Sequence, residues 1–286
     1  MTRALQALFM ILPVSFSIKI SSWLTGTGWF LIAGERNKTL NNLRLVFGSE
    51  KDEHELRKIG KEVFRNGGRN MAEFLSWEKL GHEYLRKHVK IHNGETLRRI
   101  FKEGNGIIGL TAHFGNWELL AACTAKLLNI DFSVIAREMS NPYLNGMVEE
   151  IRTSMGMKVI YREKALMALL RTIRDGKGLG ILGDQNIRGE GIYIPFLGHP
   201  AKTPRGLAEL IYRTRVPVVP MFIIRNKDLT SHDLIIENPL IFDLTGDKEE
   251  DLKLIAASYT SAIEKYVRQF PEQWMWMHDR WGLAKK

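Results

Sequence analysis

The stretch that decides the fold is residues 111–118, which reads Thr-Ala-His-Phe-Gly-Asn-Trp-Glu. The run before it, residues 106–110, is Gly-Ile-Ile-Gly-Leu, and the run after it, residues 119–123, is Leu-Leu-Ala-Ala-Cys. A short apolar run bounded by glycines, followed by polar residues and a second apolar run, predicts a buried strand, a turn and a helix. His113 then lies at the end of the strand and Glu118 in the first helical turn.

The pair formed by His113 and Glu118 has two interpretations. A carboxylate that holds one ring nitrogen of a histidine leaves the other nitrogen free to take a proton, as in a general base. The helix N-terminus adds backbone N–H groups that favour a developing negative charge. The alternative is structural: a histidine hydrogen-bonded at a strand end, and an ordinary acidic residue in a first helical turn. The spacing alone leaves both open.

From residue 95 onwards the chain alternates between strand-like and helix-like patterns. The predicted strands are residues 106–112, 132–137, 158–162, 179–183, 192–197, 216–225 and 233–237. The predicted helices are residues 95–103, the helix after the turn to about residue 128, and residues 141–155, 165–174, 203–213 and 248–270. Thr203 is the expected N-cap of its helix and Pro204 the first helical residue. This alternation predicts an α/β fold: a mixed, mainly parallel sheet with helices on both faces.

Polar side chains recur where the predicted strands end. Open α/β sheets bind their ligands outside the carboxyl ends of the strands. We therefore expect these side chains to gather around one site. They are His113, Arg137, Arg162 and the run Asp184, Gln185 and Asn186.

Residues 4–33 are the most apolar part of the chain, interrupted by one charge, Lys19. A spanning helix needs roughly 20 predominantly apolar residues, and neither half reaches this length alone. The tryptophans here favour a membrane interface. We therefore predict that residues 1–34 are a helical membrane anchor, either interfacial or a tilted span. The alternatives are a cleaved signal peptide and a buried N-terminal helix. Residues 35–286 then form a single α/β domain.

The composition narrows the choice of partners. The 286 residues include 41 Lys and Arg against 32 Asp and Glu, a formal net charge of +9. A basic surface favours nucleic acid, anionic lipid headgroups or an acidic protein. Nucleic acid is not expected, because zinc-ligand spacing, an aromatic RNA-binding signature and a reading helix are all missing from the sequence. The pair His88 and His92 has no matching carboxylate or cysteine cluster, so no metal site is expected. The single cysteine, Cys123, is expected in the core.

The sequence offers the predicted base no protein nucleophile. A Gly-x-Ser-x-Gly elbow is missing from the sequence. We therefore expect His113 to activate a hydroxyl of the substrate, which attacks an activated acyl carbonyl. Backbone N–H groups or arginines would steady the oxyanion. This chemistry calls for neither a metal nor a nucleotide cofactor.

Several motifs add up to a family resemblance. The spacing from His113 to Glu118 resembles the His-x4-Asp/Glu motif of glycerolipid and lipid A acyltransferases. Most of the chain resembles the late acyltransferases of lipid A biosynthesis, the lauroyl and myristoyl transferases of Gram-negative bacteria. The motifs are residues 42–47, 112–118, Arg137 with 141–142, Arg162, residues 183–186 and 195–198, Pro220, residues 271–274, Trp276, His278 and residues 280–281.

This resemblance implies a reaction and roles for the residues. The donor would be an acyl thioester on acyl carrier protein, which is acidic. The acceptor would be a hydroxyl of a lipid A precursor in the cytoplasmic leaflet of the bacterial inner membrane. His113 would be the general base and Glu118 its orienting partner. The substrate-binding residues would be Arg137, Arg162, Asp184, Gln185 and Asn186.

Two other functions remain open at this point. One is an acyltransferase for another glycolipid or glycerophospholipid that uses acyl-CoA. The phosphatidylinositol mannoside acyltransferases are of this kind, and they carry Asp where this chain has Glu118, which favours lipid A. The other is a lipid-binding protein without turnover, against which the intact His113 and Glu118 pair argues.

Overall fold

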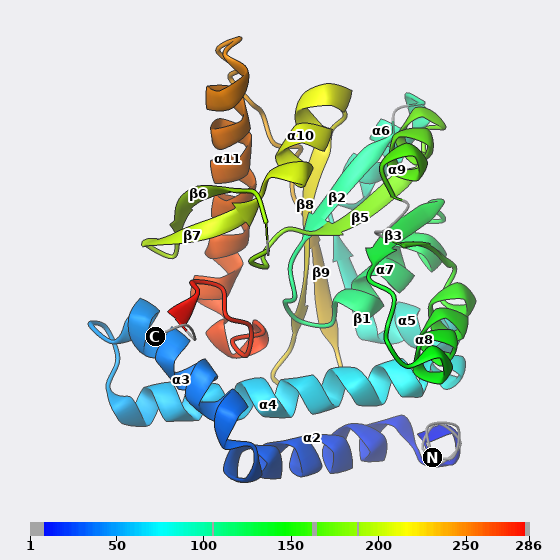
Figure 1. Ribbon diagram of the computed structural model, residues 1–286. Helices are drawn as coiled ribbons and strands as arrows, with labels where there is room; N and C mark the ends of the chain where they lie inside the picture. The colour runs from blue at the N-terminus through cyan, green and yellow to red at the C-terminus, as the bar shows by residue number, and fades with distance from the viewer. Residues whose placement is uncertain (1–8, 105, 162–164, 188, 284–286) are drawn as a thin grey trace.

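The computed structural model describes residues 9–104, 106–161, 165–187 and 189–283 (Figure 1). Its centre is a seven-stranded sheet in the order β1-β9-β8-β2-β5-β3-β4. The strands are β1 (Val89–His92), β2 (Ile107–Thr111), β3 (Phe132–Ala136), β4 (Met157–Tyr161), β5 (Gly178–Leu182), β8 (Val218–Arg225) and β9 (His232–Ile236). Only β8 and β9 pair antiparallel among these strands; the other neighbours are parallel. The predicted mixed, mainly parallel sheet is confirmed.

Helices cover both faces of the sheet, as predicted (Figure 1). One core cluster joins β2, β5 and β8 to helices α9 (Ala165–Arg174), α10 (Arg205–Thr214) and α11 (Lys248–Gln269). The other core cluster lies against helices α5 (Trp77–His88), α6 (Gly94–Lys102), α7 (Trp117–Lys126) and α8 (Pro142–Ser154). The hairpin of β6 (Gly191–Phe196) and β7 (His199–Pro204) packs beside α11. The central strand β2 is buried along its whole length, as expected for a strand covered on both faces.

The register of β2 and β5 determines where the polar strand ends meet. Thr111 pairs with Leu182, and the N–H of Gly183 donates to the carbonyl oxygen of Thr111 at 2.9 Å. The residues that follow, His113 and Asp184, are therefore brought side by side at the carboxyl edge of the sheet. Two motifs 71 residues apart in the sequence thus share one site.

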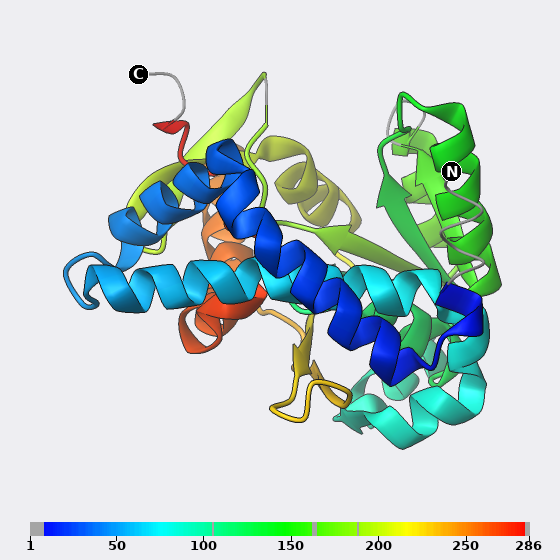
Figure 2. The same cartoon turned by 90° about the horizontal axis from the view of Figure 1, so that it is seen from below.

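Helices α2 (Val14–Leu31), α3 (Ala33–Phe47) and α4 (Glu53–Leu75) lie across this carboxyl edge. Helix α4 begins at a capping box, in which Asp52 accepts from the N–H of Glu55 and Glu55 accepts from the N–H of Asp52. Helix α2 runs along the outer side of α4 (Figures 1 and 2). The two backbones lie so close together that a Cβ at Gly68 of α4 would be 2.4 Å from the carbonyl oxygen of Ser21 in α2.

Helix α2 exposes more large apolar side chains than an ordinary surface helix does. Its buried side includes small polar residues, Ser17, Ser21 and Ser22. Large apolar side chains are exposed instead; they are Phe16, Trp23, Leu24, Phe30 and Leu31. Among the described residues no helix combines the length and the apolar character needed to cross a membrane. Residues 1–8, part of the predicted anchor, lie outside the described residues, and the division into residues 1–34 and 35–286 stays a prediction.

The structure corrects two local predictions. Strand β1 was not among the strands predicted from the sequence. A helix was expected to begin at residues 203–204, but residues 199–204 form β7, and α10 begins at Arg205. Thr203 is therefore not a helix cap. Its hydroxyl is buried and accepts a hydrogen bond from Nη2 of Arg280 at 2.7 Å, which fastens the C-terminal tail to the hairpin.

Candidate active site

The turn after β2 carries His113 and is fixed by the tail of the chain. The N–H of Gly115 donates to the carbonyl oxygen of Gln273 at 2.8 Å, and that of Met275 to the carbonyl oxygen of His113 at 3.0 Å. Gly115 has a φ of +54°, and a Cβ there would lie 1.8 Å from the carbonyl oxygen of Ile223. Only glycine fits this position. The predicted strand, turn and helix are confirmed, and the turn can adopt only a narrow range of geometries.

Polar side chains of α4 hold the same turn from the other side. Nδ2 of Asn70 donates to the carbonyl oxygen of Gly115 at 2.6 Å. Asn116 caps α7 by accepting from the N–H of Leu119 at 3.1 Å, and its Nδ2 donates to Glu73 at 2.7 Å. The backbone around His113 is thus tied to two helices and to the tail, so the ring is carried on a rigid support.

The carboxylate partner of His113 is Asp184. Nδ1 of His113 lies 2.9 Å from Oδ1 of Asp184, and the backbone N–H of His113 donates to Oδ2 at 3.0 Å. Nε1 of Trp274 donates to the same Oδ2 at 2.8 Å. Asp184 is only 2% exposed, so it lies behind the histidine and not on the surface that meets a substrate. This burial does not agree with its predicted place among the substrate-binding residues, since Asp184 contacts His113 instead.

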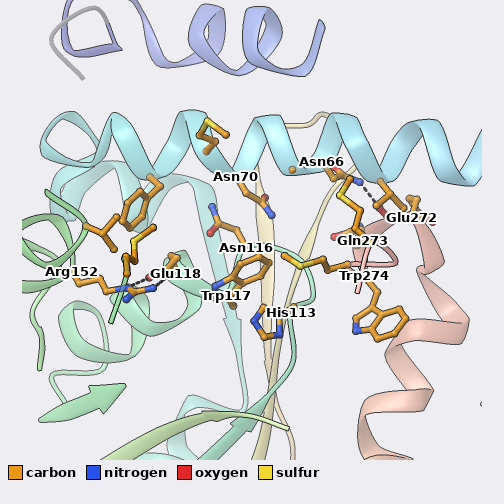
Figure 3. A pocket seen from close by; sticks show the side chains of 18 residues that line it. Asn66, Asn70, His113, Asn116, Trp117, Glu118, Arg152, Glu272, Gln273 and Trp274 are labelled. Atoms are coloured by element: carbon orange, nitrogen blue, oxygen red, sulfur yellow. Dashed lines mark hydrogen bonds and ion pairs between the residues drawn. The ribbon is translucent and has the colours of Figure 1, made fainter. Parts of the chain in front are cut away.

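Glu118 has a different partner from the one predicted. Its two carboxylate oxygens accept from Arg152 of α8, at 2.6 Å from Nη2 and 3.1 Å from Nε. The prediction that Glu118 holds a ring nitrogen of His113 is therefore wrong, because Asp184 occupies that position. Figure 3 shows the ion pair of Glu118 and Arg152 on one side of the pocket and Trp274 on the other, with His113 between them.

The second ring nitrogen of His113, Nε2, is the one that Asp184 does not contact. Nε2 of Gln185 lies 3.2 Å from Nε2 of His113. With Nδ1–H donated to Asp184, Nε2 carries a lone pair, which accepts from the Gln185 amide. The His113 side chain is 18% exposed, while Asp184 is closed off from solvent. A substrate hydroxyl that replaces the Gln185 amide would meet this lone pair.

The charges around His113 favour its protonation. Burial lowers the pKa of His113, but the charge and hydrogen bond of Asp184, with a smaller contribution from Glu118, outweigh it and raise the pKa above 6.5. Burial raises the pKa of Asp184, yet the charge of His113 and the hydrogen bonds to its carboxylate bring it below 3.8. The aspartate is therefore ionised and stabilises the imidazolium that forms when His113 takes a proton.

Two spaces of different character meet at His113. An apolar pocket of about 370 Å³ lies between α4 and the sheet, and its apolar lining includes Met71, Phe74 and Met277. A more polar groove of about 390 Å³ opens at the ends of β3 and β4, with Arg137, Asn145 and Tyr161 in its lining. His113, Trp117, Glu118 and Arg152 line both. The site can therefore hold a hydrocarbon chain and a polar group on either side of one base.

The other predicted residues divide into three groups. Arg137 is exposed and lines the polar groove with Gln185, near His113. Asn186 instead holds the tail: its N–H donates to Nε2 of His278 at 2.9 Å and its Nδ2 to the carbonyl oxygen of Asp279 at 3.3 Å. Arg162 lies outside the described residues. A substrate-binding role for Arg137, Gln185 and Asn186 stays a prediction.

Arg152 and Trp274 are site residues that the sequence did not identify. Asn145, Val148 and Arg152 line the polar groove from α8 at helical spacing, and this spacing was the available signal. Burial lowers the pKa of Arg152, but its hydrogen bond to Glu118 prevails and raises the pKa. Within the described parts of the chain, no group of three His, Cys, Asp or Glu side chains is arranged to hold a metal ion.

The fold and the site together define a class of protein. A mainly parallel α/β sheet presents a histidine backed by a buried aspartate, beside an apolar pocket and a polar groove. This arrangement fits an acyltransferase that uses a hydroxyl of its substrate as the nucleophile.

Comparison with known proteins gives the family. The family described as bacterial lipid A biosynthesis acyltransferase matches residues 2–282, and the chain belongs to it. A lipid A biosynthesis acyltransferase of Haemophilus influenzae is 26% identical over 273 residues, which cover 89% of this chain and 81% of that protein. The lipid A biosynthesis palmitoleoyltransferase of Escherichia coli is 23% identical over 245 residues, 84% of this chain and 76% of that protein. The chain is therefore an O-acyltransferase, and the predicted family is confirmed.

Proposed function

We propose that this protein transfers a fatty acyl chain from acyl carrier protein to a hydroxyl of a lipid A precursor, with His113 as the general base. The observation that carries this proposal is the pair of His113 and Asp184 at the junction of an apolar pocket and a polar groove. Family membership supports the lipid A precursor as acceptor.

The geometry suggests the order of proton transfers. Nε2 of His113 takes the proton of the acceptor hydroxyl while its oxygen attacks the thioester carbonyl. Asp184 stabilises the imidazolium through Nδ1. When the tetrahedral intermediate collapses, the carbon–sulfur bond breaks and the imidazolium returns its proton to the leaving thiolate. An ester and a free thiol result, and the base is restored.

The oxyanion of the intermediate would form near positive charge. Trp117 and Glu118, in the first turn of α7, line the pocket beside His113, where the helix N-terminus favours an anion. Glu118 holds Arg152 toward the same space. We propose that the carboxylate of Glu118 positions this arginine, and not the histidine.

The direct test is a transfer assay with purified protein and a lipid A precursor in mixed micelles. Acyl-acyl carrier protein and acyl-CoA are supplied in separate reactions at equal concentrations, and the mass of the lipid product is measured by mass spectrometry. We expect a mass increase of one acyl chain with the carrier-protein donor. Faster transfer from acyl-CoA would overturn the choice of donor. Acylation of a glycerophospholipid but not of the lipid A precursor would overturn the acceptor.

We propose that the protein lies on the cytoplasmic side of the bacterial inner membrane, as the family resemblance implies. The exposed face of α2 supports an interfacial position. Trp23, Phe30 and Leu31 are each more than half exposed. Such a group of large apolar side chains on the surface of one helix is unusual in a soluble protein and marks a site of interaction. The ammonium group of Lys61 lies 5.3 Å from the ring centroid of Phe30, so a positive charge lies beside this exposed apolar face of α2. Such a helix would lie in the bilayer surface beside anionic headgroups, and α4 would hold the active site directly behind it.

Replacing Trp23, Phe30 and Leu31 together with serine should weaken binding to vesicles that contain anionic lipid by about tenfold or more, because their apolar area no longer enters the lipid. Co-sedimentation with vesicles measures the change. The matched control replaces Tyr193 and Ile241, which are also highly exposed but lie away from α2, and should leave binding unchanged. Equal losses in both variants would contradict the proposed orientation.

Acyl transfer should rise with pH through the neutral range. His113 is a base only when neutral, and its raised pKa places the acid limb of kcat/KM above the ordinary value of 6.5. A pH profile of kcat/KM measures the midpoint. Glu118→Gln should move the midpoint down slightly, because the charge of Glu118 makes a smaller contribution to the raised pKa of His113 than Asp184 does. A midpoint at or below 6.5 in the unaltered protein would exclude His113, with its raised pKa, as the titrating group.

A further inference from the structure

The C-terminal tail brings a second histidine, His278, close to the active site. Its side chain is partly buried against the segment that follows β5. The backbone N–H of Asn186 donates to Nε2 of His278 at 2.9 Å. A backbone N–H can only donate, so Nε2 of His278 carries a lone pair and the ring proton lies on Nδ1. The contact therefore fixes both the tautomer and the neutral state of this histidine.

The tail around His278 is itself held in place. Nδ2 of Asn42, a residue of α3 that is 1% exposed, donates to the carbonyl oxygens of Trp276 at 2.9 Å and of His278 at 2.8 Å. Two residues after His278, the buried side chain of Arg280 donates to the hydroxyl of Thr203 at 2.7 Å. Because the tail is tied on both sides of the ring, His278 offers its lone pair from a fixed position.

Gln185 lies between two anchored neighbours. Asp184, on one side, accepts from the backbone N–H of His113 and contacts its ring. Asn186, on the other side, is held by His278. The backbone of Gln185 is thereby confined, and its side-chain amide lies 3.2 Å from Nε2 of His113, the nitrogen that would take the proton. His278 thus acts on the surroundings of the base through the segment that carries Gln185.

We infer that His278 is a positioning residue of the acyl-transfer site: it holds the segment after β5 so that the amide of Gln185 can orient the acceptor hydroxyl. The inference rests on the proposed function. When the hydroxyl takes the place of the amide at Nε2 of His113, the displaced amide N–H lies within reach of the hydroxyl oxygen. The hydroxyl then donates to His113, accepts from Gln185 through one lone pair and attacks the thioester carbonyl with the other.

The groups around His278 leave it neutral in the neutral pH range. Burial lowers the pKa of His278 and outweighs the charge of Asp184, which raises it. The other titratable or charged groups that act on its ring are His113, Arg280 and Asp279. Nε2 of His278 therefore keeps the lone pair that holds the segment.

The first test removes the acceptor on the tail. His278→Leu leaves the N–H of Asn186 without its partner, whereas His278→Gln supplies an amide oxygen that reaches about as far as Nε2 of histidine. In the leucine variant kcat for acyl transfer should fall about tenfold, the effect of one lost hydrogen bond, with KM for the lipid precursor nearly unchanged. The glutamine variant should recover most of the rate. His199→Leu, which replaces a partly exposed histidine of β7, is the matched control and should keep the full rate.

A double-mutant cycle tests whether His278 acts through Gln185. Gln185→Leu should lose at least as much of kcat as His278→Leu, and the double variant should lose little more than Gln185→Leu alone. The pKa of His113, measured by NMR titration of its ring protons, should rise in both single variants, because an amide that donates to Nε2 favours the neutral ring. A residue that only stabilised the tail would not change this pKa.

The outcomes separate this inference from the proposed function. Unchanged kcat and an unchanged pKa of His113 in folded His278→Leu, or losses that add fully in the double variant, would overturn the inference. His278→Asn, whose shorter side chain does not reach the N–H of Asn186, replaces the leucine variant if thermal melting shows that it is unfolded. Absence of transfer by the unaltered protein would refute the proposed function, while the NMR titration would still show whether His278 holds Gln185 against His113.

Discussion

Replacing His113 with alanine is expected to lower kcat for acyl transfer by about 10²- to 10⁴-fold, the usual contribution of a general base. The loss should lie in kcat because proton transfer occurs in the transition state and not in substrate binding. The steady-state rate with acyl-acyl carrier protein measures it. His92→Ala is the matched control, since His92 is a partly exposed histidine that also pairs with an aspartate, Asp233 at 2.6 Å, away from the site.

Asp184→Asn tests whether acyl transfer needs the correct orientation and tautomer of the His113 ring, and not only the presence of the ring. Asparagine keeps the shape of the side chain, and its amide can donate to Nδ1 of His113. The ring proton then moves to Nε2, which no longer accepts a proton from the substrate. We expect a loss of kcat close to that of His113→Ala, and the double variant should lose little more, because the two residues act as a unit. Full additivity of the two losses would show that Asp184 acts elsewhere.

The turn at His113 could be predicted from sequence because its signals are local. A buried strand of apolar residues and glycines, a glycine in the turn and an asparagine cap follow one another within 12 residues, 106–117. The carboxylate partner of His113 could not be predicted in this way. Glu118 is nearer in the sequence, but β5 lies beside β2 in the sheet and delivers Asp184. The order of strands in a sheet is not encoded in residue spacing.

The missed elements have the same origin. Strand β1 pairs with β9, about 140 residues away, and its four residues carry no strong period of their own. Residues 203–204 have the composition of a helix start, yet pairing with β6 and the hydrogen bond from Arg280 hold Thr203 in a strand. Tertiary contacts outweighed the local signal there. The ion pair of Glu118 and Arg152 joins two helices and likewise had no local signature.

The second large expected effect is on stability, and it concerns a buried ion pair beneath the turn that carries His113. Arg225 of β8 donates to Glu73 of α4 at 2.6 and 2.9 Å, and both side chains are at most 3% exposed. Glu73 also accepts from Asn116, and Arg225 donates to Asn70, the two residues that hold the turn. Burial raises the pKa of Glu73, but the charge of Arg225 lowers it further, so the carboxylate is ionised.

Arg225→Met should therefore destabilise the protein by about 3–5 kcal/mol, because it removes the guanidinium that balances the buried charge of Glu73 and leaves only Asn116 and, at 3.6 Å, His232 beside it. This corresponds to a fall of about 10 °C in Tm for a domain of this size. Thermal or urea unfolding measures the change. Arg44→Met is the matched control: Arg44 pairs with Glu53 on the surface, where such a pair contributes at most about 1 kcal/mol.

The double variant Glu73→Met with Arg225→Met tests the cause of this loss. With neither charge present, no ionised group of this pair is buried unpaired, and stability should recover well above that of either single variant. Acyl transfer should not recover with it, because Asn116 and Asn70 lose the partners that hold the turn of His113. Recovery of both would mean that the pair serves only stability. A loss for Arg225→Met no greater than for Arg44→Met would show that the buried pair contributes no more than a surface one.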